Sequence, residues 1–132
     1  MNVRLTLGKN KKVTGKKSIE ALFSSKSHAV FQFPFRIAYN KHSKPMPQHC
    51  RLLVTVSKKK FPKAVQRNRI KRQLRELFRL NQQPLFDFLV KHQLFIDIAV
   101  SYVKTDKLNF TEYEPSFVKC LDKLMNSLEK FD

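Results

Sequence analysis

Apolar residues along this chain alternate between a helical spacing and a strand spacing. In residues 14–25 they recur three and four positions apart behind a threonine, which predicts a short capped helix. In residues 30–39 every second side chain is aromatic or aliphatic, so we expect one strand with one buried face. Pro34 cannot donate a ladder hydrogen bond and therefore favours an edge position or a strand start. Residues 51–57 alternate in the same way and predict a second strand.

The second half of the chain shows the same change of spacing. Residues 62–81 follow a helical pattern, and the proline that begins them suits a first helical turn. Residues 82–84 predict a break, and residues 86–91 add a helical turn. Residues 94–103 alternate as a strand, and Pro115 is expected to open a last helix. The order of helix, two or three strands, helix, strand and helix predicts a small α+β domain, with a mixed sheet and helices packed on it.

Three phenylalanines alternate within residues 30–39. Phe31, Phe33 and Phe35 would form a stacking platform for unpaired bases if their face were open to solvent. Large apolar side chains at strict alternation are more often buried. We therefore expect these three side chains in the core.

The helix predicted over residues 62–81 has one apolar stripe and is otherwise basic. The stripe spans a sector of about 100°, as expected for a helix that packs on a core; it consists of Ile70, Leu74, Leu77 and Phe78. Cations four residues apart on the remaining surface repel one another by roughly a few tenths of a kcal/mol per pair. Glu76 relieves this repulsion only through Arg72 and Arg79. The pattern favours phosphate binding, because arginine can grip two phosphate oxygens at once.

The net charge indicates the same kind of partner. The 132 residues carry a formal charge of +17, and the first 80 contain 21 lysines and arginines against two acids. Self-repulsion of this size opposes folding, so we expect a polyanionic partner. A membrane would require apolar side chains that can insert opposite the basic face, and here they are committed to a core. Basicity alone leaves RNA and DNA both open.

Composition and spacing exclude several other classes of protein. Collagen, coiled coils and disulfide scaffolds do not fit, and no apolar run predicts a membrane span or a secretory signal. Cys50 and Cys120 are expected to be free thiols in a reducing cytosol. The histidines lack metal-ligand spacing, and the acids form no pair suited to acid–base catalysis. Asp97 is expected to make a structural hydrogen bond and not to bind magnesium. We predict no metal site and no protein-bound cofactor.

One stretch of the chain carries a specific signature. Ser57-Lys58-Lys59 ends the second predicted strand, and Arg67-Asn68-Arg69 followed by Ile70-Lys71-Arg72 lies in the basic helix. This stretch closely resembles the signature of the bacterial ribonuclease P protein subunit, which is centred on an Arg-Asn-Arg motif. The resemblance covers nearly the whole chain, and residues 13–23 are similar to the first helix of that family.

The resemblance implies a function. Proteins of this family assist a catalytic RNA that removes the 5′ leader from precursor tRNA, which implies a cytoplasmic protein. The RNA would hold the magnesium ions and perform the hydrolysis, the protein alone would be inactive, and no obligate protein partner is predicted. The resemblance also implies a left-handed crossover at the basic helix, against the usual right-handed rule.

The same resemblance implies roles for individual residues. The predicted contacts to the catalytic RNA are Lys58, Lys59, Lys60, Arg67, Asn68, Arg69, Lys71, Arg72, Arg75 and Arg79. The leader is expected in a cleft between the first helix and the sheet, where Ile19, Phe23 and Arg36 would contact it. Ile19 stands where the family usually has phenylalanine, Leu53 replaces a frequent glycine, and Ala38 lies near a common aromatic. The leader contacts therefore depart from the family pattern.

Residues 1–132 are expected to form one domain, of which residues 1–12 are a basic N-terminal segment that need not be ordered. Three other functions stay open: a protein-only nuclease, a ribosomal or other structural RNA-binding protein, and a DNA-binding helix-turn-helix protein. Cleavage of precursor tRNA by the protein alone with magnesium would favour the first. Tighter binding to ribosomal RNA or duplex DNA than to the catalytic RNA would favour the others.

Overall fold

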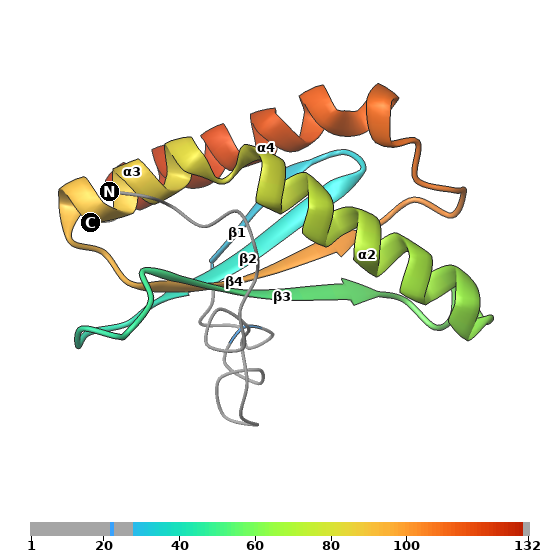
Figure 1. The fold of residues 1–132 in the computed structure, drawn as a ribbon, viewed down its shortest axis with the longest axis horizontal. Helices are drawn as coiled ribbons and strands as arrows, with labels where there is room; N and C mark the ends of the chain where they lie inside the picture. Colours follow the sequence, from blue (N-terminus) through green and yellow to red (C-terminus); the bar gives the residue numbers. More distant parts are fainter. Residues whose placement is uncertain (1–21, 23–27, 131–132) are drawn as a thin grey trace.

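The computed structural model describes Leu22 and residues 28–130, and in these residues four strands form one sheet with three helices on one face (Figure 1). The strands are β1 (His28–Gln32), β2 (Phe35–Lys41), β3 (Cys50–Val56) and β4 (Ile96–Tyr102). The helices are α2 (Ala64–Asn81), α3 (Gln83–His92) and α4 (Phe110–Lys130). Of the helix predicted over residues 14–25, only Leu22 is described, and it is helical; residues 1–12 lie outside the described part.

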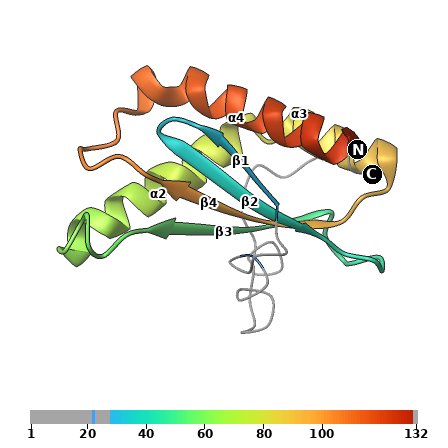
Figure 2. The ribbon, with the colours of Figure 1, turned by 180° about the vertical axis from the view of Figure 1, so that it is seen from behind.

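A crossover connection joins two parallel strands and makes the sheet mixed. The spatial order is β1-β2-β4-β3, with β2 antiparallel to both of its neighbours and β3 parallel to β4. A parallel pair cannot be joined by a hairpin, and here α2 and α3 make the connection across one face of the sheet (Figures 1 and 2). The predicted α+β class with a mixed sheet is confirmed. The left-handed sense of the crossover stays a prediction.

The single strand predicted over residues 30–39 is wrong, because the chain reverses within it. β1 and β2 form an antiparallel hairpin joined by Phe33 and Pro34, whose peptide bond is cis. Proline has no N–H group for a ladder hydrogen bond, so the pairing stops at this turn. The alternating pattern runs across the turn without a break and therefore did not reveal it.

The hairpin decides which phenylalanines are buried. Phe31 pairs with Arg36, and both residues alternate with core positions, so both belong to the sheet face that α2, α3 and α4 do not cover. We call this the outer face. Phe31 and Phe33 are 51% and 52% exposed, whereas Phe35 is fully buried and its ring meets a phenylalanine of α4. The expectation that all three are core is correct only for Phe35.

α2 matches the predicted basic helix except at its start. Its buried side chains are those of the predicted stripe, Ile70, Leu74, Leu77 and Phe78. The helix begins at Ala64, two residues after Pro62. Only Gln82 separates it from α3, whose first turn contains Pro84, so the predicted break is confined to one residue and α3 is longer than the predicted turn.

α4 begins at Phe110, and the expectation that Pro115 opens it is wrong. The side-chain oxygen of Asn109 accepts a hydrogen bond from the backbone N–H of Glu112 at 3.0 Å and so caps the helix upstream of the proline. Pro115 lies inside the helix. An asparagine followed three residues later by a glutamate is the start signal that the proline obscured.

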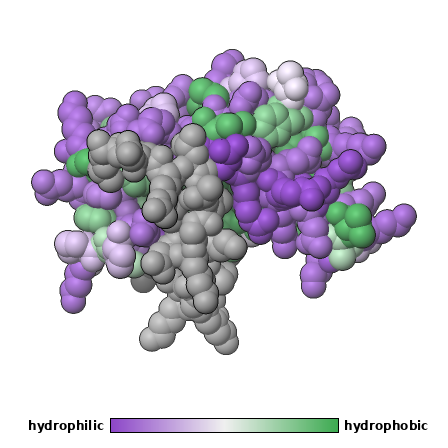
Figure 3. Space-filling view, viewed as in Figure 1, coloured by the Kyte–Doolittle hydropathy of each residue, from purple (hydrophilic) through white to green (hydrophobic). Residues whose placement is uncertain are grey.

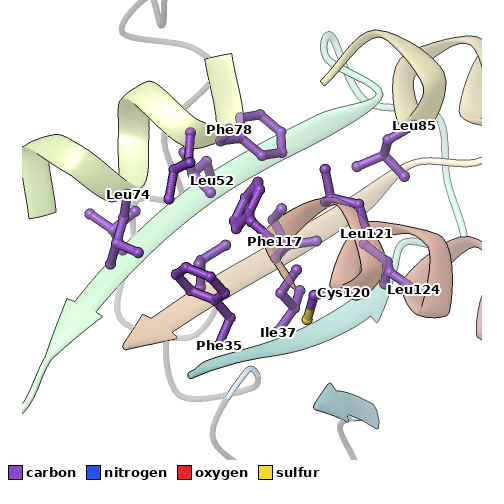
Figure 4. Close-up of a cluster of buried hydrophobic side chains, with 14 of the residues drawn as sticks. Phe35, Ile37, Leu52, Leu74, Phe78, Leu85, Phe117, Cys120, Leu121 and Leu124 are labelled. Atoms are coloured by element: carbon purple, nitrogen blue, oxygen red, sulfur yellow. The ribbon is translucent and has the colours of Figure 1, made fainter. Parts of the chain in front are cut away.

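The main core lies between the sheet and the helices (Figure 4). Phe35 and Ile37 of β2 and Leu52 of β3 meet Leu74 of α2 and Phe117 of α4, and each is at most 4% exposed. Loss of one such buried phenylalanine typically costs about 3–5 kcal/mol of stability. The core therefore holds α2 firmly and leaves the rest of its surface to solvent.

A second, small cluster lies on the outer face. Leu22 packs there with Ala38 and Ala99, all three fully buried, and Leu53 lies against them. The two alanines let the leucine approach the strands closely. The burial of Leu22 places this position of the predicted first helix against the outer face.

Candidate nucleic-acid interface

Positive charge gathers on α2 and on the turn that leads into it. We call this set the α2 cationic face; it consists of the ten predicted RNA contacts Lys58, Lys59, Lys60, Arg67, Asn68, Arg69, Lys71, Arg72, Arg75 and Arg79. None of them belongs to the buried stripe, and Glu76 is the one acid of α2. Figure 3 shows strongly hydrophilic side chains over α2. None of the described helices has the length and apolarity to cross a membrane.

Arg67 holds the entry to α2 in addition to carrying charge. Its Nη1 group donates to the carbonyl oxygens of Phe61 at 2.9 Å and Pro62 at 2.7 Å. These bonds fix the end of the turn against the first helical turn. A guanidinium has five N–H donors, so the donors on Nε and Nη2 stay outside these two bonds. Sequence reasoning predicted a contact with RNA here and missed the structural role.

Arg79 is the member of the α2 cationic face whose charge is balanced within the helix. Its Nε donates to Glu76 Oε2 at 2.9 Å, and its Nη2 contacts Glu76 Oε1. These hydrogen bonds lower the pKa of Glu76 and raise that of Arg79. Of the two arginines expected to relieve repulsion at Glu76, Arg79 makes this bond. The unbalanced charge therefore lies toward the start of α2.

Lys60 ties the turn before α2 to the end of β4. Its Nζ donates to the carbonyl oxygen of Val103 at 2.6 Å, although the side chain is exposed. The turn is also closed on itself, because the backbone N–H of Phe61 donates to the carbonyl of Ser57 at 3.0 Å. The lysine ammonium is thereby held at a defined place beside α2.

The outer face carries a polar row next to the small apolar cluster. The register aligns Phe31, Arg36, Ser101 and Thr55 across the four strands. The hydroxyls of Thr55 and Ser101 share a hydrogen bond of 2.7 Å. Arg36 is half-buried and Phe31 is exposed beside it. Sequence reasoning identified Arg36 as a leader contact, but it weighed Phe31 as a stacking residue and assigned it to the core. Recognition of a Phe-Pro turn would have placed Phe31 on this face.

The other predicted leader contacts, Ile19 and Phe23, lie outside the described residues. Leu22, one position before Phe23, is buried on the outer face. Ala38 and Leu53, which depart from the family pattern, are both part of the cluster beneath Leu22. The outer face beside Leu22 is therefore filled by aliphatic groups.

Asp97 is buried on the outer face, where Arg51 holds it and His42 lies close to it. Arg51 donates from Nε to Oδ1 and from Nη2 to Oδ2, both at 2.7 Å, and His42 Nε2 lies 2.9 Å from Oδ2. The hydrogen bond to Asp97 raises the pKa of Arg51. The predicted structural role of Asp97 is confirmed. Within the described part of the chain, no three His, Cys, Asp or Glu side chains are grouped so that they could hold a metal ion.

Cys50 and Cys120 are free thiols, as predicted, and both are buried. Burial raises the pKa of both thiols, that of Cys120 to about 11. At neutral pH each is therefore almost entirely protonated and a poor nucleophile.

Comparisons with known proteins agree with this geometry. A model of the ribonuclease P family matches residues 7–125. The ribonuclease P protein component of Porphyromonas gingivalis is 31% identical over 122 residues, which cover 92% of this chain and 88% of that protein. The ribonuclease P protein component of Idiomarina loihiensis is 59% identical over 44 residues, covering 32% of this chain and 35% of that protein.

Solved structures show the same fold. The RNase P protein of Staphylococcus aureus gives a TM-score of 0.66 at 24% identity, with 88% of this chain and 96% of that chain covered. The RNase P protein of Thermotoga maritima gives 0.64 at 20% identity, with 85% and 96% covered. Because the family model spans most of the sequence, and a relative above 30% identity is covered nearly end to end, this chain belongs to the ribonuclease P protein family.

Proposed function

We propose that this protein is the RNA-binding subunit of a cytoplasmic ribonuclease P, and that it docks on the catalytic RNA through the α2 cationic face. The observation that carries the proposal is the placement of this charge. It lies on the solvent side of a helix whose opposite side is locked in the core. A rigid cationic surface can neutralise RNA phosphates and release their counterions with little loss of conformational entropy on binding.

The exposed arginines of α2 suit this docking best. Arg69, Arg72 and Arg75 are exposed and unlike Arg79 have no acid recorded beside them in the described structure. The planar guanidinium group can donate two parallel hydrogen bonds to one phosphate. Arg67 contributes by holding the turn so that the lysines before α2 continue the same surface.

We also propose that the 5′ leader of precursor tRNA lies on the outer face. Arg36 supplies a cation there, and the exposed ring of Phe31 beside it supplies a surface on which an unpaired base can stack. Ile19 and Phe23 complete this site in the proposal, on the predicted helix that contains Leu22. Phe31 offers an aromatic surface one strand away from Ala38, which lies near the position where the family commonly has an aromatic.

The protein supplies binding and no catalytic groups in this proposal. Among the described residues of the outer face, the buried carboxylate is Asp97, and Arg51 already engages both of its oxygens, so the described residues do not fit a magnesium site. Magnesium is assigned mainly to the RNA, where it supplies metal-activated water for phosphodiester hydrolysis. The protein reduces repulsion between the two RNAs and positions the leader. No obligate protein partner is part of the proposal.

Cleavage of precursor tRNA tests the proposed function against a protein-only nuclease. The protein with magnesium should cut nothing, and addition of the catalytic RNA at near-physiological magnesium should give cleavage at the end of the leader. Cleavage by the protein alone would overturn the proposal in favour of a nuclease. Failure to stimulate the RNA, together with tighter binding to ribosomal RNA, would favour a structural RNA-binding protein.

A further inference from the structure

A hollow of about 430 Å³ lies beside α2, between its first turns and the connection from β4 to α4. This volume is in the range of sites that hold small organic molecules, about 300–1,000 Å³. Its walls come from three segments that are distant in the sequence. Lys60 stands on the turn before α2, Gln66, Arg69 and Gln73 stand on α2, and Lys107 stands on the connection.

The charge around the hollow is positive. Lys60, Arg69 and Lys107 all line it, and none of the described residues that line it is acidic. The ammonium group of Lys60 is held in place by its 2.6 Å bond to the carbonyl of Val103. An ammonium has three N–H donors, so this bond leaves two of them for a ligand. The rim is therefore built to receive an anion.

The floor of the hollow is apolar, which a bare phosphate does not need. Phe61, Ile70 and Leu108 line it and are each at most 6% exposed. Two amide side chains lie beside this floor, and that of Gln73 is fixed by a 3.3 Å hydrogen bond from Nε2 to the carbonyl of Leu108. An apolar surface with amide groups beside it matches a nucleobase, whose faces are apolar and whose edges donate and accept hydrogen bonds.

We propose that this hollow takes one unpaired nucleotide of the catalytic RNA, with its phosphate at the cationic rim and its base on the apolar floor. The inference rests on the proposed function and names a site within it. RNA is the source favoured by position, because Arg69 belongs both to the hollow and to the α2 cationic face. A strand that follows that face passes the rim of the hollow.

A substitution that fills the hollow without changing its charge tests the proposal. Thr105 is exposed and lines the hollow from the connection, so Thr105→Trp puts a large side chain there and keeps every cation. Thr111, an exposed threonine in the first turn of α4, gives the matched control Thr111→Trp. We expect Thr105→Trp to weaken binding of the full chain to the catalytic RNA by roughly tenfold, the loss typical of one base contact. The slope of affinity against salt should stay that of the unsubstituted protein.

Base reactivity supplies the second readout. Reagents that attack Watson–Crick edges should find one unpaired RNA base protected by the unsubstituted protein and by Thr111→Trp, and reactive again with Thr105→Trp. Lys107→Gln provides a second variant that leaves the hollow open. It should lower the salt slope by about 0.7–0.9, as expected for one lost phosphate contact.

Three outcomes would overturn the inference. The first is unchanged affinity and base protection with Thr105→Trp, and the second is an unchanged salt slope with Lys107→Gln. The third is tight binding of free AMP or UMP that Thr105→Trp abolishes while RNA binding is untouched, which would assign the hollow to a free nucleotide. Absence of any salt-dependent binding of the unsubstituted protein to the catalytic RNA would instead overturn the proposed function.

Discussion

At the scale of single residues, variants of Arg67 and Arg69 can distinguish the structural role of the Arg-Asn-Arg motif from its proposed role in RNA binding. Arg67 donates to two backbone carbonyls at the entry to α2, while Arg69 is exposed. Arg67→Ala should therefore lower the free energy of unfolding by about 1.5–3 kcal/mol, as for loss of hydrogen bonds to a charged group. Arg69→Ala should change it by no more than about 0.5 kcal/mol.

Both variants should bind the catalytic RNA more weakly. Denaturant melts and RNA titrations on the same samples distinguish the two effects. Arg67→Lys is the control that keeps the charge and loses the fork of donors. Equal stability of Arg67→Ala and Arg69→Ala would contradict the structural role of Arg67.

Phe31 is the residue that tests the outer face as the leader site. Phe31→Ala should cost stability by no more than about 0.5 kcal/mol because the ring is exposed. The holoenzyme should lose about 1–3 kcal/mol of affinity for precursor tRNA, the value of one stacked base. Its affinity for mature tRNA should not change, because mature tRNA has no leader.

Phe33→Ala is the matched control for this prediction. Phe33 is as exposed as Phe31 but lies in the turn, outside the paired positions of the outer face. It should leave the ratio of precursor to mature tRNA affinity unchanged. A drop of that ratio in Phe33→Ala and not in Phe31→Ala would place the leader elsewhere. For Phe23→Ala, the affinities for precursor and mature tRNA, measured together with a denaturant melt, decide whether Phe23 belongs to the core or to the leader site.

At the scale of elements, the start of α4 depends on one side chain. Asn109→Ala removes the cap of the Glu112 N–H and should destabilise the protein by about 0.5–2 kcal/mol. Asn109→Asp keeps an acceptor at the same place and should retain the stability of the unsubstituted protein. A thermal or denaturant melt of both variants measures this. Equal free energies of unfolding for Asn109→Ala and Asn109→Asp would show that Pro115 and the packing of α4 define the start of the helix without the cap.

The elements that the sequence predicted well are those whose signal is local and strong. The apolar stripe of α2 repeats at helical spacing over several turns, so only a helix fits it. The structure buries the same four residues. The hairpin at Pro34 was missed because an unbroken alternation is compatible with both a straight strand and a two-residue turn. The turn reverses the face of every residue before it, which moves Phe31 from the core to the outer face.

Contacts between distant segments could not be predicted from local patterns. The bonds of Arg67 to the turn, the bond of Lys60 to the end of β4, and the ion pair of Asp97 with Arg51 all depend on how the chain folds back. The hollow beside α2 depends on the same arrangement. The sequence identified the cations of the α2 cationic face and could not show which of them are engaged by other groups.

At the scale of the whole molecule, the sheet separates two surfaces to which we assign different roles. The helix side carries the α2 cationic face, and the outer face carries Arg36 and Phe31. The chain is most basic in its first part, where 21 of the 27 lysines and arginines precede residue 81. In our account the protein uses one surface for the catalytic RNA and the other for the leader, so that it touches enzyme and substrate at once.

The salt dependence of binding to the catalytic RNA tests the central claim, that the α2 cationic face is where the RNA docks. The variant carries Arg69→Gln, Arg72→Gln and Arg75→Gln, three exposed positions outside the buried stripe. A matched control with Lys91→Gln, Lys119→Gln and Lys130→Gln loses the same charge from exposed positions on α3 and α4.

Each lost phosphate contact should lower the slope of log affinity against log salt by about 0.7–0.9. The account predicts that the α2 variant loses about two to three units of slope and binds the RNA much more weakly. The control should keep nearly the full slope of the unsubstituted protein. Equal slopes for the two variants would mean that the RNA senses only the total charge of the protein, and would contradict docking on α2.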